Sequence, residues 1–144
     1  MIVICYHLTV KLITKYTDYA IRALLFMAEK KKEIFSVSEL SKELKISRPF
    51  LRLILQILSK KRILTSSKGK GGGFKLALPA HNVFIADIIN IFQGPIKFDD
   101  CFIKENLCPD FRGCPLKEEI REVGDYVNKK FNSMTIQSFL DKKD

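Results

Sequence analysis

Three cysteines lie close together in the second half of the chain, in the stretch CFIKENLCPDFRGC. Cys101, Cys108 and Cys114 are spaced C-x6-C-x5-C, and no fourth cysteine lies nearby. A tetrahedral metal ion or an iron–sulfur cluster takes four donors at each site, and thiolates suit both. Pro109 and Pro115 each follow a cysteine directly and disfavour regular structure in this stretch. The spacing raises the question of what is bound here and which residue supplies a fourth ligand.

Four interpretations of this cysteine cluster compete. Inert or disulfide-linked cysteines are unusual in the reducing cytosol. Zinc sites usually contain C-x2–4-C pairs, which this sequence lacks. A reactive thiol needs a neighbouring base, and the two histidines, His7 and His81, belong to no recognisable nucleophile signature, so an enzyme is not expected. An iron–sulfur cluster on a loop that can wrap it is favoured, with a zinc-bound or metal-free protein as the alternative.

The charge of the chain is unevenly distributed. The net charge is +9, and residues 1–80 hold 16 Lys and Arg against 5 Asp and Glu, whereas residues 81–144 hold 9 against 11. A basic first half is typical of a segment that meets a polyanion such as DNA. The opening MIVICYHLTV is apolar, but it lacks a basic n-region and a cleavage site, and no stretch is long enough to cross a bilayer. The sequence therefore predicts a cytoplasmic protein.

The first half has the periodicity of a helix-turn-helix unit. A first helix is expected from Thr17, which can cap it, with Asp18 in its first turn. SVSELSKELKIS predicts a second helix, in which Ser36 and Glu39 have the spacing of a capping box.

A third helix is expected to start at Ser47, after a tight turn. Its exposed face carries Arg48, Arg52 and Gln56, while apolar residues face inward. In a helix-turn-helix the second helix of the pair enters the major groove, so these side chains are candidates for DNA contacts.

A glycine-rich hairpin is expected directly after these helices. ILTSS, KGKGG and GFKLALP indicate a strand, a turn and a second strand, with Phe74, Leu76 and Leu78 facing inward. Lys68 and Lys70 lie at its tip and could neutralise phosphate. The glycines fit neither a P-loop nor a dinucleotide fingerprint, because no GK[ST] and no following helix are present.

The second half is expected to contain a short helix in NVFIADIINIFQG and a long one after Pro115. The long helix carries apolar residues spaced by three or four positions, from Leu116 to Met134. Such a stripe could pack on its own domain or on a second copy. Pairing with a second copy is favoured, because operators are commonly palindromic.

The ordered combination resembles the winged-helix iron–sulfur transcriptional regulators of the IscR and NsrR type. The resemblance covers about residues 11–140 and rests on KLITKYTDYAIRALLFMA, SVSELSKELKISRPFLRLILQIL, SSKGKGGGFKLALP and the spaced cysteines. It implies a mainly α fold with a small β-hairpin wing. The expected division is a winged helix-turn-helix domain at 11–80, then a linker helix, a cysteine loop (99–115) and a dimerisation helix within 81–144.

The same resemblance implies a homodimeric DNA-binding repressor or activator, with a repressor favoured, that responds to nitric oxide, redox stress or cluster supply. Its DNA contacts would come from Ser47, Arg48, Arg52, Gln56, Lys68 and Lys70. Its iron–sulfur cluster would lie near the dimer interface and link the cysteine loop to the first helix of the partner, which would set the spacing of the two recognition helices.

The resemblance also bears on the fourth ligand. In the IscR type a histidine three residues after the third cysteine completes a two-iron cluster, and Lys117 stands at that position here. In the NsrR type an aspartate at the start of the first helix, donated by the partner subunit, completes a four-iron cluster, and Asp18 matches it. Asp18 and a four-iron cluster are therefore favoured over a two-iron cluster. The extension at residues 1–10 brings Cys5 and His7 into consideration as competing ligands.

Overall fold

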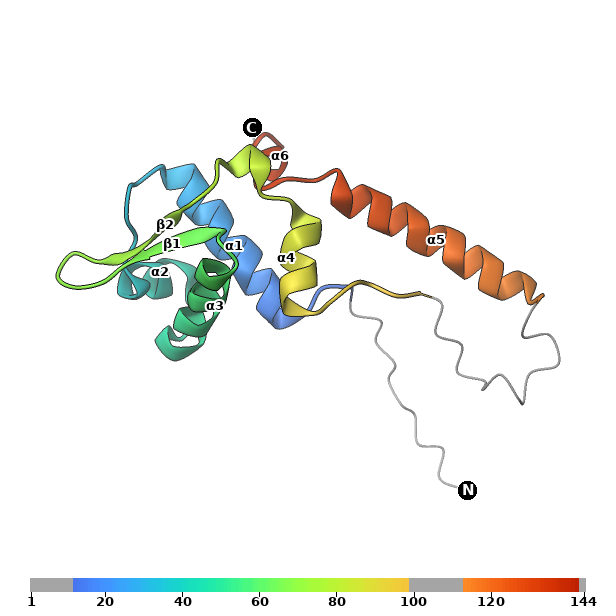
Figure 1. Ribbon diagram of the computed structural model, residues 1–144, viewed down its shortest axis with the longest axis horizontal. Helices are drawn as coiled ribbons and strands as arrows, with labels where there is room; N and C mark the ends of the chain where they lie inside the picture. Colours follow the sequence, from blue (N-terminus) through green and yellow to red (C-terminus); the bar gives the residue numbers. More distant parts are fainter. Residues whose placement is uncertain (1–11, 99–112, 143–144) are drawn as a thin grey trace, which may run out of the picture.

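The computed structural model describes residues 12–98 and 113–142. This part of the chain contains six α-helices, one 3-10 turn and a two-stranded antiparallel sheet (Figure 1). In chain order the elements are α1 (Lys15–Lys30), α2 (Val37–Leu44), α3 (Arg48–Lys60), β1 (Leu64–Ser67), β2 (Gly73–Leu76), η1 (Ala80–Asn82), α4 (Ile85–Phe92), α5 (Pro115–Asn132) and α6 (Ile136–Leu140). The expectation of a mainly α fold with a β-hairpin wing is confirmed.

Helix α1 begins before the position expected from the sequence. Its N-cap is Thr14, whose hydroxyl accepts a hydrogen bond from the Thr17 backbone N–H. Thr17 itself lies inside the helix and is fully buried. The cap predicted at Thr17 was therefore wrong by three residues. Residue type alone does not distinguish the two positions, because threonine is a suitable cap at either.

Helices α2 and α3 form the expected helix-turn-helix. Ser36 caps α2 by accepting from the Glu39 N–H at 3.1 Å. The Glu39 carboxylate binds Lys32 Nζ at 2.7 Å. This ion pair replaces the second hydrogen bond of the predicted capping box, in which Glu39 would accept from the Ser36 backbone N–H. The inner face of α3 is fully buried through Leu51, Ile54, Leu55 and Leu58. Burying this face leaves its basic face toward solvent.

Three basic residues occupy left-handed backbone positions next to these helices. Lys31 caps the end of α1 with φ 48° and Lys45 caps the end of α2 with φ 55°. Arg62, which follows α3, has φ 62°. Glycine is the residue that usually takes this conformation, because it has no Cβ.

The wing is held against the body by a third backbone segment. Strands β1 and β2 pair in the register Leu64↔Leu76 to Ser67↔Gly73. Phe35 adds two backbone hydrogen bonds to Phe74, each of 2.8 Å. Phe74 is buried as expected, but Leu78 is 41% exposed. The expectation for Leu78 was wrong because β2 ends at Leu76 and the strand alternation stops there.

The core extends beyond the helix-turn-helix into the second half of the chain. Ile136 N–H donates to Val83 O and Ile85 N–H donates to Met134 O, both at 2.9 Å, which joins the segment before α4 to the segment before α6. One hydrophobic cluster contains side chains from both halves, among them Ala20, Leu24, Leu55, Ile85, Ile88 and Ile136. Helix α6, which the sequence did not predict, closes this core beside α1. The division at residue 80 stays a prediction about chain organisation, and the described residues on its two sides share this core.

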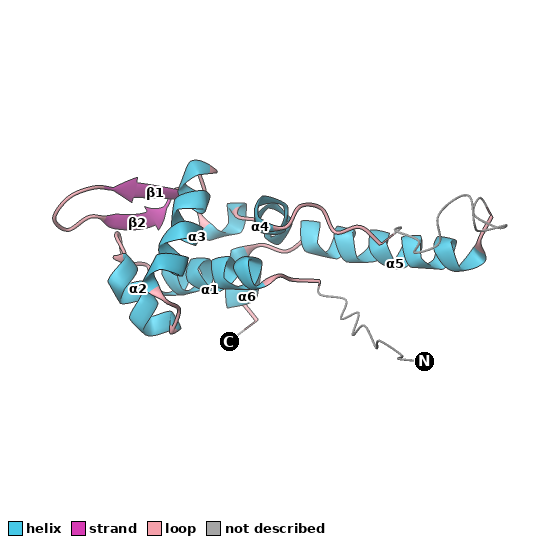
Figure 2. Ribbon diagram, turned by 90° about the horizontal axis from the view of Figure 1, so that it is seen from below, coloured by secondary structure: helices cyan, strands magenta, loops and turns pink. Residues whose placement is uncertain are grey.

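Helix α5 extends away from this body. Figures 1 and 2 show its first turn at the far end of the molecule and its last turn near α6. Leu116, Ile120 and Val123 are 66%, 38% and 56% exposed, whereas Phe131 near its end packs against the core. Within the described residues, no helix is both long and apolar enough to cross a membrane.

Candidate nucleic-acid interface and cysteine site

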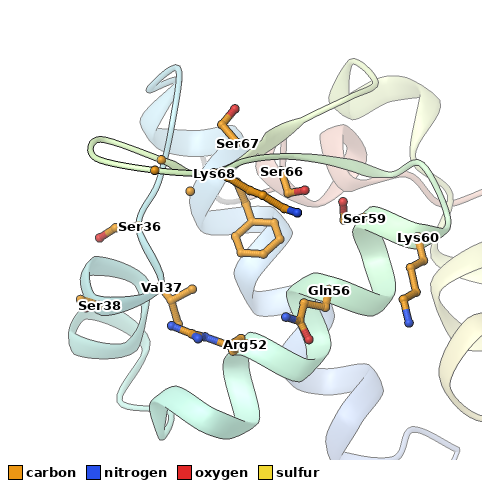
Figure 3. Close-up of a pocket in the computed structure, with 14 residues that line it drawn as sticks. Ser36, Val37, Ser38, Arg52, Gln56, Ser59, Lys60, Ser66, Ser67 and Lys68 are labelled. Carbon is orange, nitrogen blue, oxygen red and sulfur yellow. The ribbon is translucent and has the colours of Figure 1, made fainter.

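A groove of about 760 Å³ separates α3 from the wing. Arg52 and Gln56 of α3 line one side, and Ser66 and Lys68 of the hairpin line the other. Figure 3 shows the α3 side chains and Lys68 around the same space. The start of α2, at Ser36 to Ser38, closes one end of the groove. The structure thus brings three predicted DNA contacts, Arg52, Gln56 and Lys68, to one surface.

The exposed face of α3 offers both charge and hydrogen-bonding groups. Arg48 and Arg52 are exposed and form no ion pair within the described part of the chain. Ser47 is the N-cap of α3, yet its side chain makes no capping hydrogen bond. Its hydroxyl is therefore available at a helix N-terminus, where phosphate oxygens are commonly bound.

The turn of the wing presents its lysines on a glycine-rich backbone. Lys68 and Lys70 are exposed, and the neighbouring Gly69 and Gly71 have φ of +92° and +77°. These angles are accessible to glycine at little cost and keep the turn narrow. Lys70 lies outside the residues that line the groove, at the tip of the hairpin.

Sequence reasoning missed two parts of the groove. Lys60 lines it, one helical turn beyond Gln56, and continues the series of Arg48, Arg52 and Gln56 at four-residue spacing. That spacing was a signal that could have identified Lys60. Ser36 and Ser38 could not be identified in this way, because they reach the groove only through the packing of α2 beside α3.

The cysteine site is described only in part. Cys114 is the half-buried N-cap of α5, and its thiol is free. Cys101 and Cys108, like Cys5 and His7, lie outside the described residues. Within residues 12–98 and 113–142, no three His, Cys, Asp or Glu side chains are grouped as a metal site would require.

The other candidate ligand, Asp18, lies far from Cys114 in the single chain. Asp18 is in the first turn of α1, its side chain is 43% exposed, and its Oδ2 accepts from Arg22 Nε at 2.9 Å. In both views the first turn of α5 lies well away from α1 (Figures 1 and 2). One copy of the chain therefore does not bring the two side chains together.

The residues that are described suit a thiolate centre. Cys114 is the N-cap of the 18-residue helix α5 and makes no side-chain capping hydrogen bond, so the helix does not engage its sulfur. A thiolate set with one carboxylate is a donor set that iron accepts.

The comparison with known proteins decides the family. The sequence model of Rrf2, described as an iron-dependent transcriptional regulator, matches residues 13–142. The chain belongs to this family. It is a transcriptional regulator of the Rrf2 family, which confirms the resemblance inferred from the sequence motifs.

One curated relative and two solved structures agree with this assignment. The chain is 34% identical over 110 residues to the HTH-type transcriptional regulator NsrR of Oceanobacillus iheyensis, and the match covers 75% of each protein. Its fold is similar to that of CymR, the global cysteine regulator of B. subtilis, with a TM-score of 0.75, 21% identity, and coverage of 94% of this chain and 100% of that one. The T. potens IscR structure has a TM-score of 0.71 and 20% identity, with coverage of 92% and 88%. NsrR and CymR are named as regulators, in line with the expectation of a protein that is not an enzyme.

Proposed function

We propose that this Rrf2 regulator is a homodimeric repressor that binds operator DNA and holds an iron–sulfur cluster in its cysteine loop. The observation that carries the DNA-binding part is the groove between α3 and the wing, where Arg52, Gln56 and Lys68 converge. These groups supply the positive charge and the base-reading side chains that a major-groove interface needs.

The contacts divide by chemistry into base reading and phosphate binding. Arg52 can donate two hydrogen bonds to a guanine, and Gln56 can pair with an adenine edge. Ser47 and Arg48, at the N-terminus of α3, are placed to bind phosphate. Lys68 and Lys70 would follow the backbone beside the groove without reading sequence.

A second copy of the chain completes the assembly. Leu116, Ile120 and Val123 leave an apolar stripe on α5 that the described residues of one chain do not cover. Pairing two such stripes would bury them and would present two recognition helices to a palindromic operator.

The cluster part of the proposal rests on the donor set and on the family. Cys101, Cys108 and Cys114 would supply three thiolates, and Asp18 of the partner subunit would supply a carboxylate. When bound, such a four-iron cluster supplies an iron with an exchangeable oxygen ligand that nitric oxide or oxidants can attack. Arg22 would hold the Asp18 carboxylate in place through the ion pair that it forms within α1.

Anaerobic purification followed by iron, sulfide and zinc analysis tests the cluster directly. We expect a brown protein with roughly equal iron and acid-labile sulfide, which Cys114→Ala loses while it stays folded. A colourless protein with stoichiometric zinc would establish the zinc-bound alternative. Fluorescence anisotropy with operator and random duplexes tests the DNA part, and equal affinity for both would contradict sequence-specific binding.

A further inference from the structure

Gln93, the residue that ends α4, binds the start of α1 with both ends of its side-chain amide. Its Oε1 accepts from the Thr14 backbone N–H at 2.9 Å and from the Thr17 hydroxyl at 2.8 Å. Its Nε2 donates to the Leu12 carbonyl at 2.8 Å. Because the carbonyl and the amino group are both occupied, the amide has one orientation that satisfies all three bonds.

The position of these bonds couples two elements that are distant in sequence. Thr17 is the one buried polar side chain within the described residues, and it is fully buried. Its hydroxyl also lies 3.0 Å from the Thr14 hydroxyl, which caps α1. A shift of Gln93 would remove the acceptor of the Thr14 N–H and would leave the buried Thr17 hydroxyl with only the Thr14 hydroxyl as partner, and both losses are unfavourable.

The chain that follows Gln93 contacts α5 and precedes the cysteine loop in the sequence. Gly94 has φ +75°, which lets the chain turn away from α4. The Ile96 carbonyl then accepts from Asn128 Nδ2 of α5 at 3.5 Å. Phe98 packs against Gly124 so closely that a Cβ at residue 124 would lie 2.8 Å from the Phe98 ring. Residues 94–98 thus connect Gln93 to α5, and in the sequence they precede the segment that carries Cys101.

The start of α1 in turn contacts α3, which the proposed function makes the recognition helix. The ring of Phe50, in the first turn of α3, lies 4.6 Å from the Tyr16 ring and 5.7 Å from the Tyr19 ring, measured between centroids. Lys15 Nζ lies 5.5 Å from the Tyr19 centroid. Aromatic pairs at these separations have preferred geometries. A displacement of the start of α1 would therefore change the ring packing at the start of α3.

We propose that Gln93 is a positioning residue that couples residues 94–98 and α5, the helix that Cys114 caps, to the recognition helix through the first turn of α1. The coupling runs from residues 94–98 to Gln93, from Gln93 to Thr14 and Thr17, and from Tyr16 and Tyr19 to Phe50. It rests on the proposed function for its signal, because that function places the cluster on the cysteines. The physical link itself belongs to the single chain and exists without any bound metal.

The test compares Gln93→Ala and Gln93→Glu with a matched control, Gln137→Ala. Gln137 of α6 also uses its Nε2 in a hydrogen bond, to Asp141 Oδ1 at 2.8 Å, but lies off the proposed route. Gln93→Glu keeps the acceptor for Thr14 and Thr17 and places a second oxygen against the Leu12 carbonyl. Because Gln93→Glu retains the size of the side chain, it can be measured even if Gln93→Ala fails to fold.

Two measurements decide the proposal. In metal-free protein, we expect faster amide exchange at Thr14, Thr17 and Asp18 and a changed Phe50 ring resonance in both Gln93 variants, and neither change in Gln137→Ala. In cluster-loaded protein, we expect the ratio of operator Kd values with and without the cluster to fall from about tenfold to near one, with unchanged iron content.

The outcomes also separate this proposal from the proposed function. If the parent protein binds no cluster, or if its DNA affinity does not respond to one, the proposed function fails. Amide exchange and the Phe50 resonance in metal-free protein then test on their own whether Gln93 is coupled to α3. Unchanged exchange and ring resonances in both Gln93 variants overturn the coupling. So does a retained Kd ratio in a Gln93 variant that binds the cluster normally, or an equal loss in Gln137→Ala.

Discussion

Arg52 is the side chain whose loss we expect to weaken operator binding most selectively. It lies on the exposed face of α3 and lines the groove beside Gln56. A bidentate arginine contact to a base is worth about 1–3 kcal/mol, so Arg52→Ala should weaken operator binding by about that amount and relax the preference at one base pair.

Anisotropy titrations against the operator and single-base variants measure the Arg52 effect. Lys142→Ala is the control, because it removes one positive charge from an exposed position near the C-terminus. If Arg52→Ala reduces affinity for operator and random DNA by the same factor, Arg52 binds phosphate and reads no base.

Asp18 has two possible roles that substitution can separate. As a first-turn aspartate paired with Arg22, it contributes about 0.3–1 kcal/mol to stability through the helix dipole and little through the exposed ion pair. As a cluster ligand, it is needed for a stable iron centre. We expect Asp18→Asn to leave the fold nearly intact and to make the cluster labile in absorption spectra.

Asp87→Asn is the matched control for Asp18. Asp87 is exposed and occupies the first turn of α4, so its loss should carry the same dipole cost with no effect on the cluster. Equal cluster content and equal reactivity with nitric oxide in Asp18→Asn and the parent protein would leave Asp18 only its dipole role and would direct attention to Cys5 and His7.

The wing depends on a close approach that only glycine permits. A Cβ at Gly73 would lie 2.2 Å from the Phe35 carbonyl oxygen, which is the acceptor of a hydrogen bond from Phe74. We therefore expect Gly73→Ala to separate this segment from the wing, to lower the free energy of unfolding by about 1–3 kcal/mol and to weaken DNA binding.

Chemical denaturation and the same DNA titrations test the Gly73 prediction. Gly113→Ala serves as the control, because a Cβ at Gly113 meets nothing within 4 Å. A Gly73→Ala protein as stable as the parent would show that the wing can shift without cost.

The elements differ in how far the sequence predicts them. Helices α1 to α4 and the hairpin follow from apolar periodicity and turn residues. Helix α6 does not, because its five residues bury only Ile136 and its position depends on bridging contacts from Val83 and Phe84. The prediction that Leu78 faces inward failed for a related reason. Strand length is determined by pairing, and pairing ends at Leu76.

The candidate site divides in the same way. The basic face of α3 and the wing lysines could be predicted, because helical spacing and a glycine-rich turn are local properties. The role of Gln93 could not, because its bonds to Thr14 and Thr17 join residues 79 and 76 positions apart. Such contacts become visible only once the fold is known.

At the scale of the whole molecule, α5 is the surface that we expect to hold two copies together. Val123 is 56% exposed on its apolar stripe. Burial of a valine contributes about 1.5–3 kcal/mol, so Val123→Lys should raise the dimer dissociation constant by roughly tenfold or more. Sedimentation velocity over a range of concentrations measures this constant.

Glu122→Lys is the control for the dimer prediction. It places the same side chain one position earlier on α5, where Glu122 is already exposed and charged. If Val123→Lys and the parent have the same dimer constant, the stripe on α5 is not the interface.

The net charge of +9 should make DNA binding strongly dependent on salt. Each phosphate neutralised contributes about −0.9 to the slope of log K against log salt concentration. We expect Lys68→Ala and Lys70→Ala each to reduce the slope by about one, on operator and random DNA alike. Titrations at several salt concentrations measure the slope, and an unchanged slope would place these lysines away from the phosphates.

At the left-handed positions next to α1, α2 and α3, a substitution that stabilises the backbone would also remove a positive charge. Lys31, Lys45 and Arg62 each adopt a backbone conformation that costs a residue with a Cβ roughly 1 kcal/mol or more relative to glycine. Glycine at these three points would relax the backbone and also remove three positive charges from the basic half of the chain. Thermostabilisation and affinity for a polyanion are therefore opposed demands on this scaffold, and an attempt to improve one by backbone idealisation would reduce the other.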